Sequence, residues 1–219
     1  MLTMLWAAKG GTGTTFVSCA LALAHRHTTL IVDLDGDVPD ALGLPPNDRP
    51  GAHDWLRSDA PPEHLPDLLV SATDDLVVMP AHASDTERST EAIAPQRWAA
   101  LADWCSEWHA RGERSVVVDA GTGSPPESLV DVADRALLVT RRCYLALSAA
   151  HRFTGNATGI VLIDEDGRTL PSRGVTDAVG APIAATVRYD RAAYQALDAG
   201  LLHTPLPRAV RRHLAPLVA

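Results

Sequence analysis

Short apolar runs alternate with longer amphipathic stretches along most of the chain. The apolar runs are four to six residues long, rich in Val, Ile and Leu, and mostly without polar alternation. This pattern is typical of strands that are buried on both faces of a parallel sheet. Strands are predicted at residues 2–7, 29–33, 76–79, 115–119, 136–140, 159–163 and 183–187.

The amphipathic stretches between these runs predict helices. They cover residues 14–26, 95–110, 126–132, 144–153, 171–179 and 191–199. Alternating strands and helices predict an α/β fold, with a doubly wound, mostly parallel sheet and helices on both faces. Ligands of such folds bind beyond the carboxyl ends of the strands, so the loops that follow the strands are the candidate sites.

Length and composition fit one folded domain. The chain has 219 residues, of which 46% are hydrophobic and 21% charged, and we expect a single domain over residues 1–219. The Pro-rich stretch 44–66 is expected to be a surface excursion, and 204–219 a terminal tail. A net charge of −8 argues against a dedicated nucleic-acid binder.

The expected location is the cytoplasm. No apolar window approaches the roughly 18 residues of a membrane span, and the apolar start has no preceding basic residues, unlike a signal peptide. Cys19, Cys105 and Cys143 are odd in number and form no CxxC pair, which favours a reducing compartment without disulfides or an iron–sulfur cluster. The histidines show no zinc-ligand spacing, so no zinc site is expected.

A glycine-rich loop follows the first strand and leads directly into a helical pattern. It reads AKGGTGTT over residues 8–15. Backbone N–H groups that converge in such a loop, together with the helix dipole, bind phosphate. The ordinary phosphate-loop pattern GxxxxGK[ST] fails twice, because Ala8 replaces the first glycine and Thr14 replaces the lysine. A glycine-rich turn that binds no phosphate is the alternative.

The segment KGGTGTT resembles the deviant Walker A loop of the ParA/MinD family of partitioning ATPases, which reads KGGxGK[ST]. The matching residues are Lys9, Gly10, Gly11, Gly13 and Thr15. Of the 19 basic residues in the chain, all but Lys9 are arginine, so the match includes its one lysine. Thr14 departs from the pattern at the position of the second lysine.

This resemblance implies an ATP or ADP site with Mg²⁺ and a homodimer that closes around the nucleotide. The loop residues Gly10 to Thr15, with Thr12 and Thr14 among them, would contact the phosphates. Lys9 would reach the partner's phosphates as a catalytic residue, and Thr15 would bind Mg²⁺. Loss of the in-site lysine removes a charged hydrogen bond, which is worth about 10- to 150-fold in affinity.

Acidic residues follow the second strand in the series Asp33, Asp35 and Asp37. They resemble the family's first switch, whose second aspartate positions Mg²⁺ and the attacking water. Asp35 matches that aspartate best, and Asp37 is the close alternative. A solvated acidic turn would give the same pattern, since Asp-Gly is common turn chemistry.

The run SVVVD at 115–119 has the Walker B form, a hydrophobic strand that ends in an acid. Asp119 is therefore a candidate for holding the magnesium and its water shell. Gly123 falls on the family's γ-phosphate-sensing glycine. Any doubly wound sheet can place an aspartate after a strand, so the order and distance from the glycine-rich loop give this motif its value.

Two further positions complete the candidate site. The adjacent Arg141 and Arg142 follow the strand 136–140, and Arg142 could supply the phosphate charge lost at Thr14; a pair of solvated arginines is the alternative. At the base end, Asp190 fits the family's final motif, and Arg188 or Tyr189 could stack on a purine.

The chain's end is Arg-rich and carries apolar residues at 210, 214 and 217. Family members use this region for membranes or for non-specific DNA. Arg208, Arg211 and Arg212 could contact DNA, although the acidic balance opposes it, and Pro216 is expected to break the helix. We expect neither membrane nor DNA binding here, and favour a terminal helix packed on the sheet.

Three functions fit the pattern. The first is a ParA/MinD-like nucleotide-binding protein that dimerises, binds a protein partner and organises a cargo, a division site or a secretion apparatus. The second is a pseudo-ATPase adaptor that acts through protein contacts. A metabolic enzyme of the same superfamily is disfavoured because no substrate-binding extension is visible. At most a slow ATPase is expected, since charge at the transferring phosphoryl group is most of the catalysis.

Overall fold

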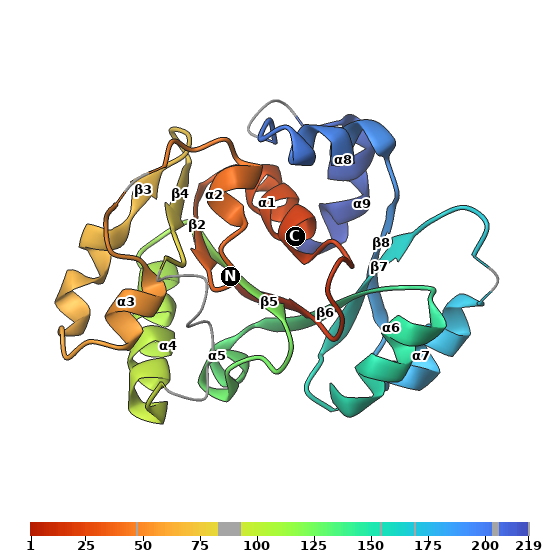
Figure 1. Cartoon of the computed structure of the whole chain (residues 1–219), viewed down its shortest axis with the longest axis horizontal. Helices are drawn as coiled ribbons and strands as arrows, with labels where there is room; N and C mark the ends of the chain where they lie inside the picture. Colours follow the sequence, from red (N-terminus) through yellow and green to blue (C-terminus); the bar gives the residue numbers. More distant parts are fainter. Residues whose placement is uncertain (47, 83–92, 154, 169, 203–205, 219) are drawn as a thin grey trace.

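The computed structural model describes residues 1–46, 48–82, 93–153, 155–168, 170–202 and 206–218. The strands are β1 (Leu2–Ala7), β2 (Thr28–Asp33), β3 (Val70–Ser71), β4 (Leu76–Met79), β5 (Arg114–Thr122), β6 (Arg135–Arg141), β7 (Gly159–Asp164) and β8 (Ile183–Arg188). Within the described residues they form one sheet in the order β3-β4-β2-β5-β1-β6-β7-β8. All neighbours are parallel except β3 and β4, as Figure 1 shows.

Each strand expected from the sequence is present, so the predicted α/β class and parallel sheet are confirmed. Several strands run one to three residues further than expected. The longest extension is in β5, which continues through Asp119 to Thr122. The antiparallel β3 at the sheet edge was not predicted, because two residues are too short to produce a periodic signal.

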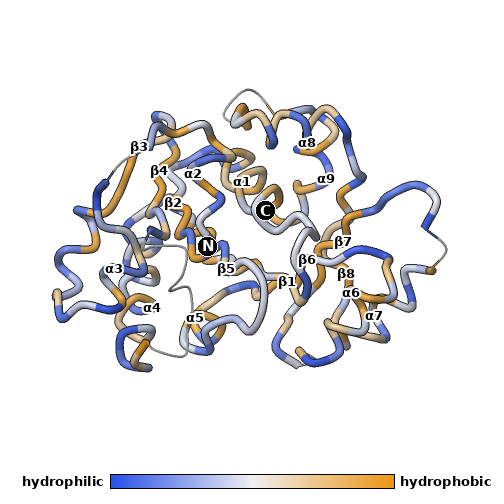
Figure 2. The backbone as a smooth tube through the Cα atoms, viewed as in Figure 1, coloured by the Kyte–Doolittle hydropathy of each residue, from blue (hydrophilic) through white to orange (hydrophobic). Residues whose placement is uncertain are grey.

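Helices cover both faces of the sheet (Figure 1). They are α1 (Thr14–Ala24), α2 (Val38–Ala41), α3 (Ala52–Leu56), the 3₁₀ helix η1 (Pro62–Leu68), α4 (Pro95–Ala110), α5 (Glu127–Val132), α6 (Tyr144–Ala150), the 3₁₀ helix η3 (His151–Phe153), α7 (Ser172–Val179), α8 (Arg191–Asp198) and α9 (Arg208–Val218). One apolar cluster packs α1, α2, α8 and α9 against the sheet. The other packs α3 to α7 against the opposite face. Figure 2 shows the hydrophobic residues concentrated along the strands between these layers.

Side chains alternate between these two layers along each strand. In β6, Leu137 and Val139 belong to the α1 layer, whereas Ala136 and Leu138 belong to the α4 layer. Successive side chains of a strand point to opposite faces, so this alternation continues to the strand's last residue. It decides which residues after each strand can reach the start of α1.

The Pro-rich stretch 44–66 does more than run over the surface. It contains α3 and the beginning of η1, and it buries Trp55, Leu56 and Leu65 in the core. The expected surface excursion is therefore also a core element. Pro61 and Pro62 stand at the start of η1, where a missing N–H is tolerated, whereas Pro66 lies inside it.

The terminal helix α9 packs on β8 and α1 through the buried Val210, Leu214 and Leu217. The prediction that Pro216 would break this helix is wrong, because α9 continues to Val218. Only two residues of α9 follow the proline, so the disturbance falls on the last turn of the helix. Residues 204, 205 and 219 of the predicted tail lie outside the described residues. No helix in the described part of the chain is long and apolar enough to cross a membrane.

Candidate functional site

The loop between β1 and α1, residues 8–15, is called the glycine loop below. Gly11 and Gly13 have φ angles of 74° and 96°, in the left-handed region that favours glycine. At Gly13 a Cβ atom would also lie 2.7 Å from the Tyr194 hydroxyl oxygen. The sequence therefore needs glycine here for the backbone to turn tightly into the first turn of α1.

The side chains of the glycine loop offer little positive charge toward its interior. Lys9 is exposed, Thr14 is 7% exposed, and Thr15 is partly buried. A short threonine thus occupies the buried position where the ordinary phosphate loop has its lysine. Any further charge for a phosphate has to come from another segment.

Asp33 and Asp119 end up side by side beneath the start of α1, and we call them the carboxylate pair. They are partners in the parallel β2–β5 register, and both are fully buried. They follow Ile31 and Val117 of the α1 layer by two residues, so all four side chains share one face of the sheet.

Asp33 shapes the loop that follows β2. Its carboxylate accepts backbone hydrogen bonds from Asp35 at 3.0 Å, from Gly36 at 2.7 Å and from Val38 at 3.3 Å. Burial nevertheless raises the pKa of Asp33 to about 6, because these bonds offset only part of the desolvation and the charge of Asp35 adds to it. Asp33 had not been predicted as a site residue; its strand position two residues after Ile31 was the available signal.

Asp119 is a predicted site residue with an incomplete set of hydrogen bonds. Its Oδ1 accepts the Gly121 N–H at 3.1 Å, whereas Oδ2 has no hydrogen-bond partner among the described residues. Burial and the charge of Asp33 raise the pKa of Asp119 well above its ordinary value, and Gly121 and the Thr15 hydroxyl offset this only in part. A buried carboxylate oxygen without a partner fits a cation or a water bound to one.

Asp35 lies against Gly121, near the end of β5. A Cβ atom on Gly121 would be 2.4 Å from the Asp35 carboxyl group, and Gly121 has a φ angle of 63°. The Gly123 N–H donates to the Ala7 carbonyl oxygen at 2.9 Å. The structure therefore brings Asp35 to the end of β5, the strand that carries Asp119, and Gly123 to the end of β1; their roles toward magnesium and phosphate stay predictions.

The residues present fit a magnesium ion. Asp119, Asp35 and the Thr15 hydroxyl are oxygen ligands, and Mg²⁺ in proteins keeps several waters and takes only one or two carboxylates. Within the described part of the chain, no group of three or more His, Cys, Asp or Glu side chains is arranged to hold a metal by itself. A magnesium here would therefore depend on water and on phosphate oxygens for its remaining ligands.

Arg142 lies away from the glycine loop. It forms an ion pair with Asp164 and donates to the Leu170 carbonyl oxygen at 3.4 Å. Arg141 instead donates from Nε to the Thr12 carbonyl oxygen at 3.4 Å and pairs with Glu165 at 2.6 Å. The side chains of Arg141 and Arg142 are only 23% and 21% exposed, so they are not the solvated pair considered as an alternative.

The candidate base end is built by the loops after β7 and β8. Asp190 caps α8, accepting the N–H groups of Ala192 at 2.9 Å and Ala193 at 3.2 Å. Tyr189 is 45% exposed and packs its ring on Tyr194, with the ring centroids 4.6 Å apart. Tyr194 in turn stacks on Phe16 of α1 at the same centroid distance.

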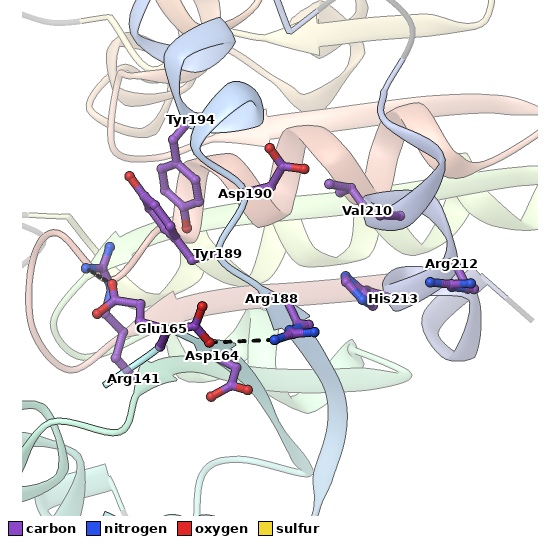
Figure 3. A pocket seen from close by; sticks show the side chains of 12 residues that line it. Arg141, Asp164, Glu165, Arg188, Tyr189, Asp190, Tyr194, Val210, Arg212 and His213 are labelled. Atoms are coloured by element: carbon purple, nitrogen blue, oxygen red, sulfur yellow. Dashed lines mark hydrogen bonds and ion pairs between the residues drawn. The ribbon is translucent and has the colours of Figure 1, made fainter. Parts of the chain in front are cut away.

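A cavity of about 810 Å³ opens beside these aromatic rings (Figure 3). Arg141 and Glu165 lie at one end of it, and Arg212 and His213 of α9 at the other. Arg188 pairs with Asp166 at its mouth, at 3.6 Å. Arg141, whose Nε donates to the Thr12 carbonyl oxygen of the glycine loop, therefore lies in the wall of a cavity with the volume that drug-sized ligands occupy.

No protein-family model and no curated protein sequence matches the chain. Several solved structures match the chain. The septum site-determining protein MinD of Pyrococcus horikoshii, complexed with Mg-ADP, is 19% identical with a TM-score of 0.74, covering 100% of this chain and 95% of its own. A ParA family ATPase from Chlorobium tepidum is 20% identical with a TM-score of 0.74, covering 99% and 97%.

The fold is that of the MinD and ParA ATPases. A third solved structure, a putative plasmid partition protein from Borrelia burgdorferi bound to AMPPNP, has a TM-score of 0.75 at 10% identity, with coverage of 99% and 96%. At such identities the likeness concerns the course of the backbone. The function has to be argued from the side chains of the site.

Proposed function

We propose that the protein is a MinD/ParA-like nucleotide-binding protein that dimerises and positions another cellular component, with slow or no ATP hydrolysis. The observation that supports this most is the buried carboxylate pair beside Thr15 at the start of α1. Two like charges, one of them with an oxygen that has no partner, are costly to bury unless a cation joins them.

In this proposal the backbone of Gly10 to Thr15 binds the phosphates of ATP or ADP, and the Thr15 hydroxyl, Asp35 and Asp119 hold Mg²⁺ and its waters. When bound, Mg²⁺ neutralises phosphate charge. Gly123 senses the terminal phosphate, and the exposed Lys9 extends toward the phosphates of a second copy. Binding would thus be coupled to dimerisation.

Weak hydrolysis follows from the missing charge at Thr14. In the transition state of the transfer, the phosphoryl group spreads negative charge over its oxygens, and cations placed around it supply most of the catalysis. With Mg²⁺ and backbone N–H groups alone, we expect binding to exceed turnover. A protein partner in the cytoplasm is expected, since the neighbouring side chains Tyr144 and Leu145 at the start of α6 are 76% and 62% exposed.

A pseudo-ATPase adaptor that binds no nucleotide is the second candidate. The observation that favours it is the replacement of the loop lysine by Thr14, with Arg141 and Arg142 both engaged in ion pairs. Such a protein would act through its surface alone. It would keep the fold and the glycine loop without using either for phosphate.

DNA and membrane binding remain less favoured. The outer face of α9 exposes Arg208, Arg211 and Arg212 to solvent, but the chain's net charge is −8. The apolar face of α9 is covered by β8 and α1, so it has no surface left for lipid. If a DNA column does not retain the protein at any salt concentration, the result would agree with this.

Calorimetric titration of the purified chain with ATP and ADP in the presence of Mg²⁺ tests the proposal. We expect measurable binding to the wild type, tighter binding to Thr14→Lys, and a dimer in light scattering only with ATP. Absence of heat for both proteins would reject nucleotide binding. Heat of binding from Thr14→Lys, with none from the wild type, would support the adaptor.

A further inference from the structure

We propose that Arg141 supplies to the nucleotide phosphates the positive charge that Thr14 cannot, and that Glu165 holds this arginine in reserve until a phosphate competes for it. This rests on the proposed nucleotide-binding function. In this proposal β6 supplies the positive charge that, in the ordinary phosphate loop, comes from a lysine of the loop itself.

The position of Arg141 supports this assignment. Its guanidinium Nε donates to the Thr12 carbonyl oxygen, in the middle of the glycine loop. Its charge also acts on the Tyr194 hydroxyl, which lies directly above Gly13. Arg141 therefore contacts the glycine loop at Thr12, two residues before the start of α1, where backbone N–H groups point at an anion.

Strand alternation explains why Arg141 reaches the loop and Arg142 does not. Arg141 follows Leu137 and Val139 on the face covered by α1, and Arg142 points to the face covered by α6 and α7. The glycine loop leads into α1, so it lies on the α1 face as well. A charge meant for this loop has to come from an odd-numbered residue of β6.

The Glu165 carboxylate is shared between two arginines. One oxygen accepts from Arg141 at 2.6 Å, and the other forms an ion pair with Arg168. Two guanidinium groups face one carboxylate, so the cluster keeps a net positive charge toward the loop. Because Arg168 stays on Glu165, Arg141 can exchange its carboxylate partner for a phosphate without leaving Glu165 unpaired. The exchange replaces one charged hydrogen bond by another.

The decisive measurement is the affinity for ATP with Mg²⁺, by calorimetry, of four proteins. They are the wild type, Arg141→Ala, Arg142→Ala and Arg173→Ala, which removes a charge from the exposed face of α7. We expect Arg141→Ala to weaken binding by about 10- to 150-fold, the worth of a charged hydrogen bond. Arg173→Ala should bind like the wild type, and thermal melts confirm that each variant is folded.

Glu165→Gln tests the role of Glu165 and should change the affinity for ATP in the opposite direction. Removing the competing carboxylate charge while keeping its size should tighten ATP binding several-fold, because Arg141 then gives up a weaker partner. A merely structural ion pair predicts the reverse, a loss of affinity together with a loss of stability. Introducing Thr14→Lys into Arg141→Ala should restore binding, since a lysine in the loop makes the arginine dispensable.

The outcomes separate this inference from the proposed function. If neither the wild type nor Thr14→Lys binds ATP, nucleotide binding itself is rejected. If only Thr14→Lys binds, or if Arg141→Ala binds like the wild type, Arg141 does not replace the lysine and the inference falls alone. An equal or larger loss in Arg142→Ala would assign the charge to the neighbouring residue and overturn it too.

Discussion

The two halves of the site handle buried charge in opposite ways. Around β2 and β5, the buried Asp33 and Asp119 lie side by side, and neither forms an ion pair with a basic side chain among the described residues. Around β6 and β7, Arg141 and Arg142 each meet a carboxylate of β7 or the loop after it. We call the first the incomplete half and the second the satisfied half. The comparison teaches that one sheet can bury acidic groups without a basic side chain at one place and pair both arginines with an acid at another.

Removing one carboxylate from the incomplete half should give the largest effect. Asp119→Asn relieves the repulsion with Asp33 and the burial of a charge, so we expect the metal-free protein to gain about 1–3 kcal/mol of stability. The same change should abolish stabilisation by ATP with Mg²⁺. Thermal melts with and without Mg-ATP measure both effects.

Asp74→Asn, at an exposed turn position, is the matched control for loss of one negative charge and should change neither quantity. A metal-free Asp119→Asn protein less stable than the wild type would show that the carboxylate pair is a structural network, and the contrast between the two halves would then fail.

The pH dependence sharpens the same comparison. The folded pKa of Asp33, about 6, lies above the ordinary value of 3.8, so its contribution is fully present below pH 3.8 and is lost as pH rises through 6. The shift of about 2 pH units corresponds to about 3 kcal/mol. Urea melts of the metal-free protein should show this loss between pH 4 and 6, and Mg-ATP should reduce it.

A second titratable group changes the stability in the same pH range; it lies just before β2, at the other end of the strand from Asp33. Burial, with the charge of His27, lowers the pKa of His25 from 6.5 to about 4. Its contribution is present above pH 6.5 and is lost as pH falls through 4. His25→Leu removes this opposing term, so melts of that variant isolate the Asp33 effect; a flat profile between pH 4 and 6 would contradict it.

An effect of similar size is expected where β5 touches the loop after β2. Gly121→Ala places a methyl group against the Asp35 carboxyl group, which should cost about 1–3 kcal/mol of stability. Gly167→Ala is the comparison, because Gly167 also has a left-handed φ angle, 78°, but its Cβ would meet no atom within 4 Å. Equal losses in the two variants would show that backbone strain alone matters.

The smallest effect belongs to the satisfied half. Arg142 and Asp164 are 21% and 29% exposed, so their pair should show a coupling of about 1 kcal/mol in a double-mutant cycle of Arg142→Ala and Asp164→Ala. Chemical denaturation of the four proteins measures it. A coupling near zero would mean that packing, and not the ion pair, stabilises this half. The contrast between the two halves would then fail.

The parts of the site with a local pattern could be predicted from the sequence. Buried strands and a glycine loop between strand and helix produce such a pattern, so the strands and the place of the loop between β1 and α1 could be predicted. The roles of Lys9, Thr15 and Asp119 stay predictions. The role of Asp33 and the choice between Arg141 and Arg142 depend on partners far along the chain, such as Glu165 and Asp119. Parity along β6, counted from Val139, would have favoured Arg141, but only once the face of the glycine loop was known.

The burial of the 44–66 segment was hidden for a different reason. Its short helices contain too few turns for periodicity to appear, and its apolar residues pack against α4, which lies far away in the sequence. The prolines there predict a surface excursion, but they say nothing about the depth of the apolar residues between them.

The two-residue period of β6 also bears on how such a site can change over generations. Deleting one residue between Val139 and Arg141 would move Arg142 into the place that Arg141 now holds, on the face of the glycine loop. The tandem arginine at the end of β6 would therefore keep a guanidinium group beside the loop after such a deletion. An insertion at the same place would carry both arginines past the present end of β6.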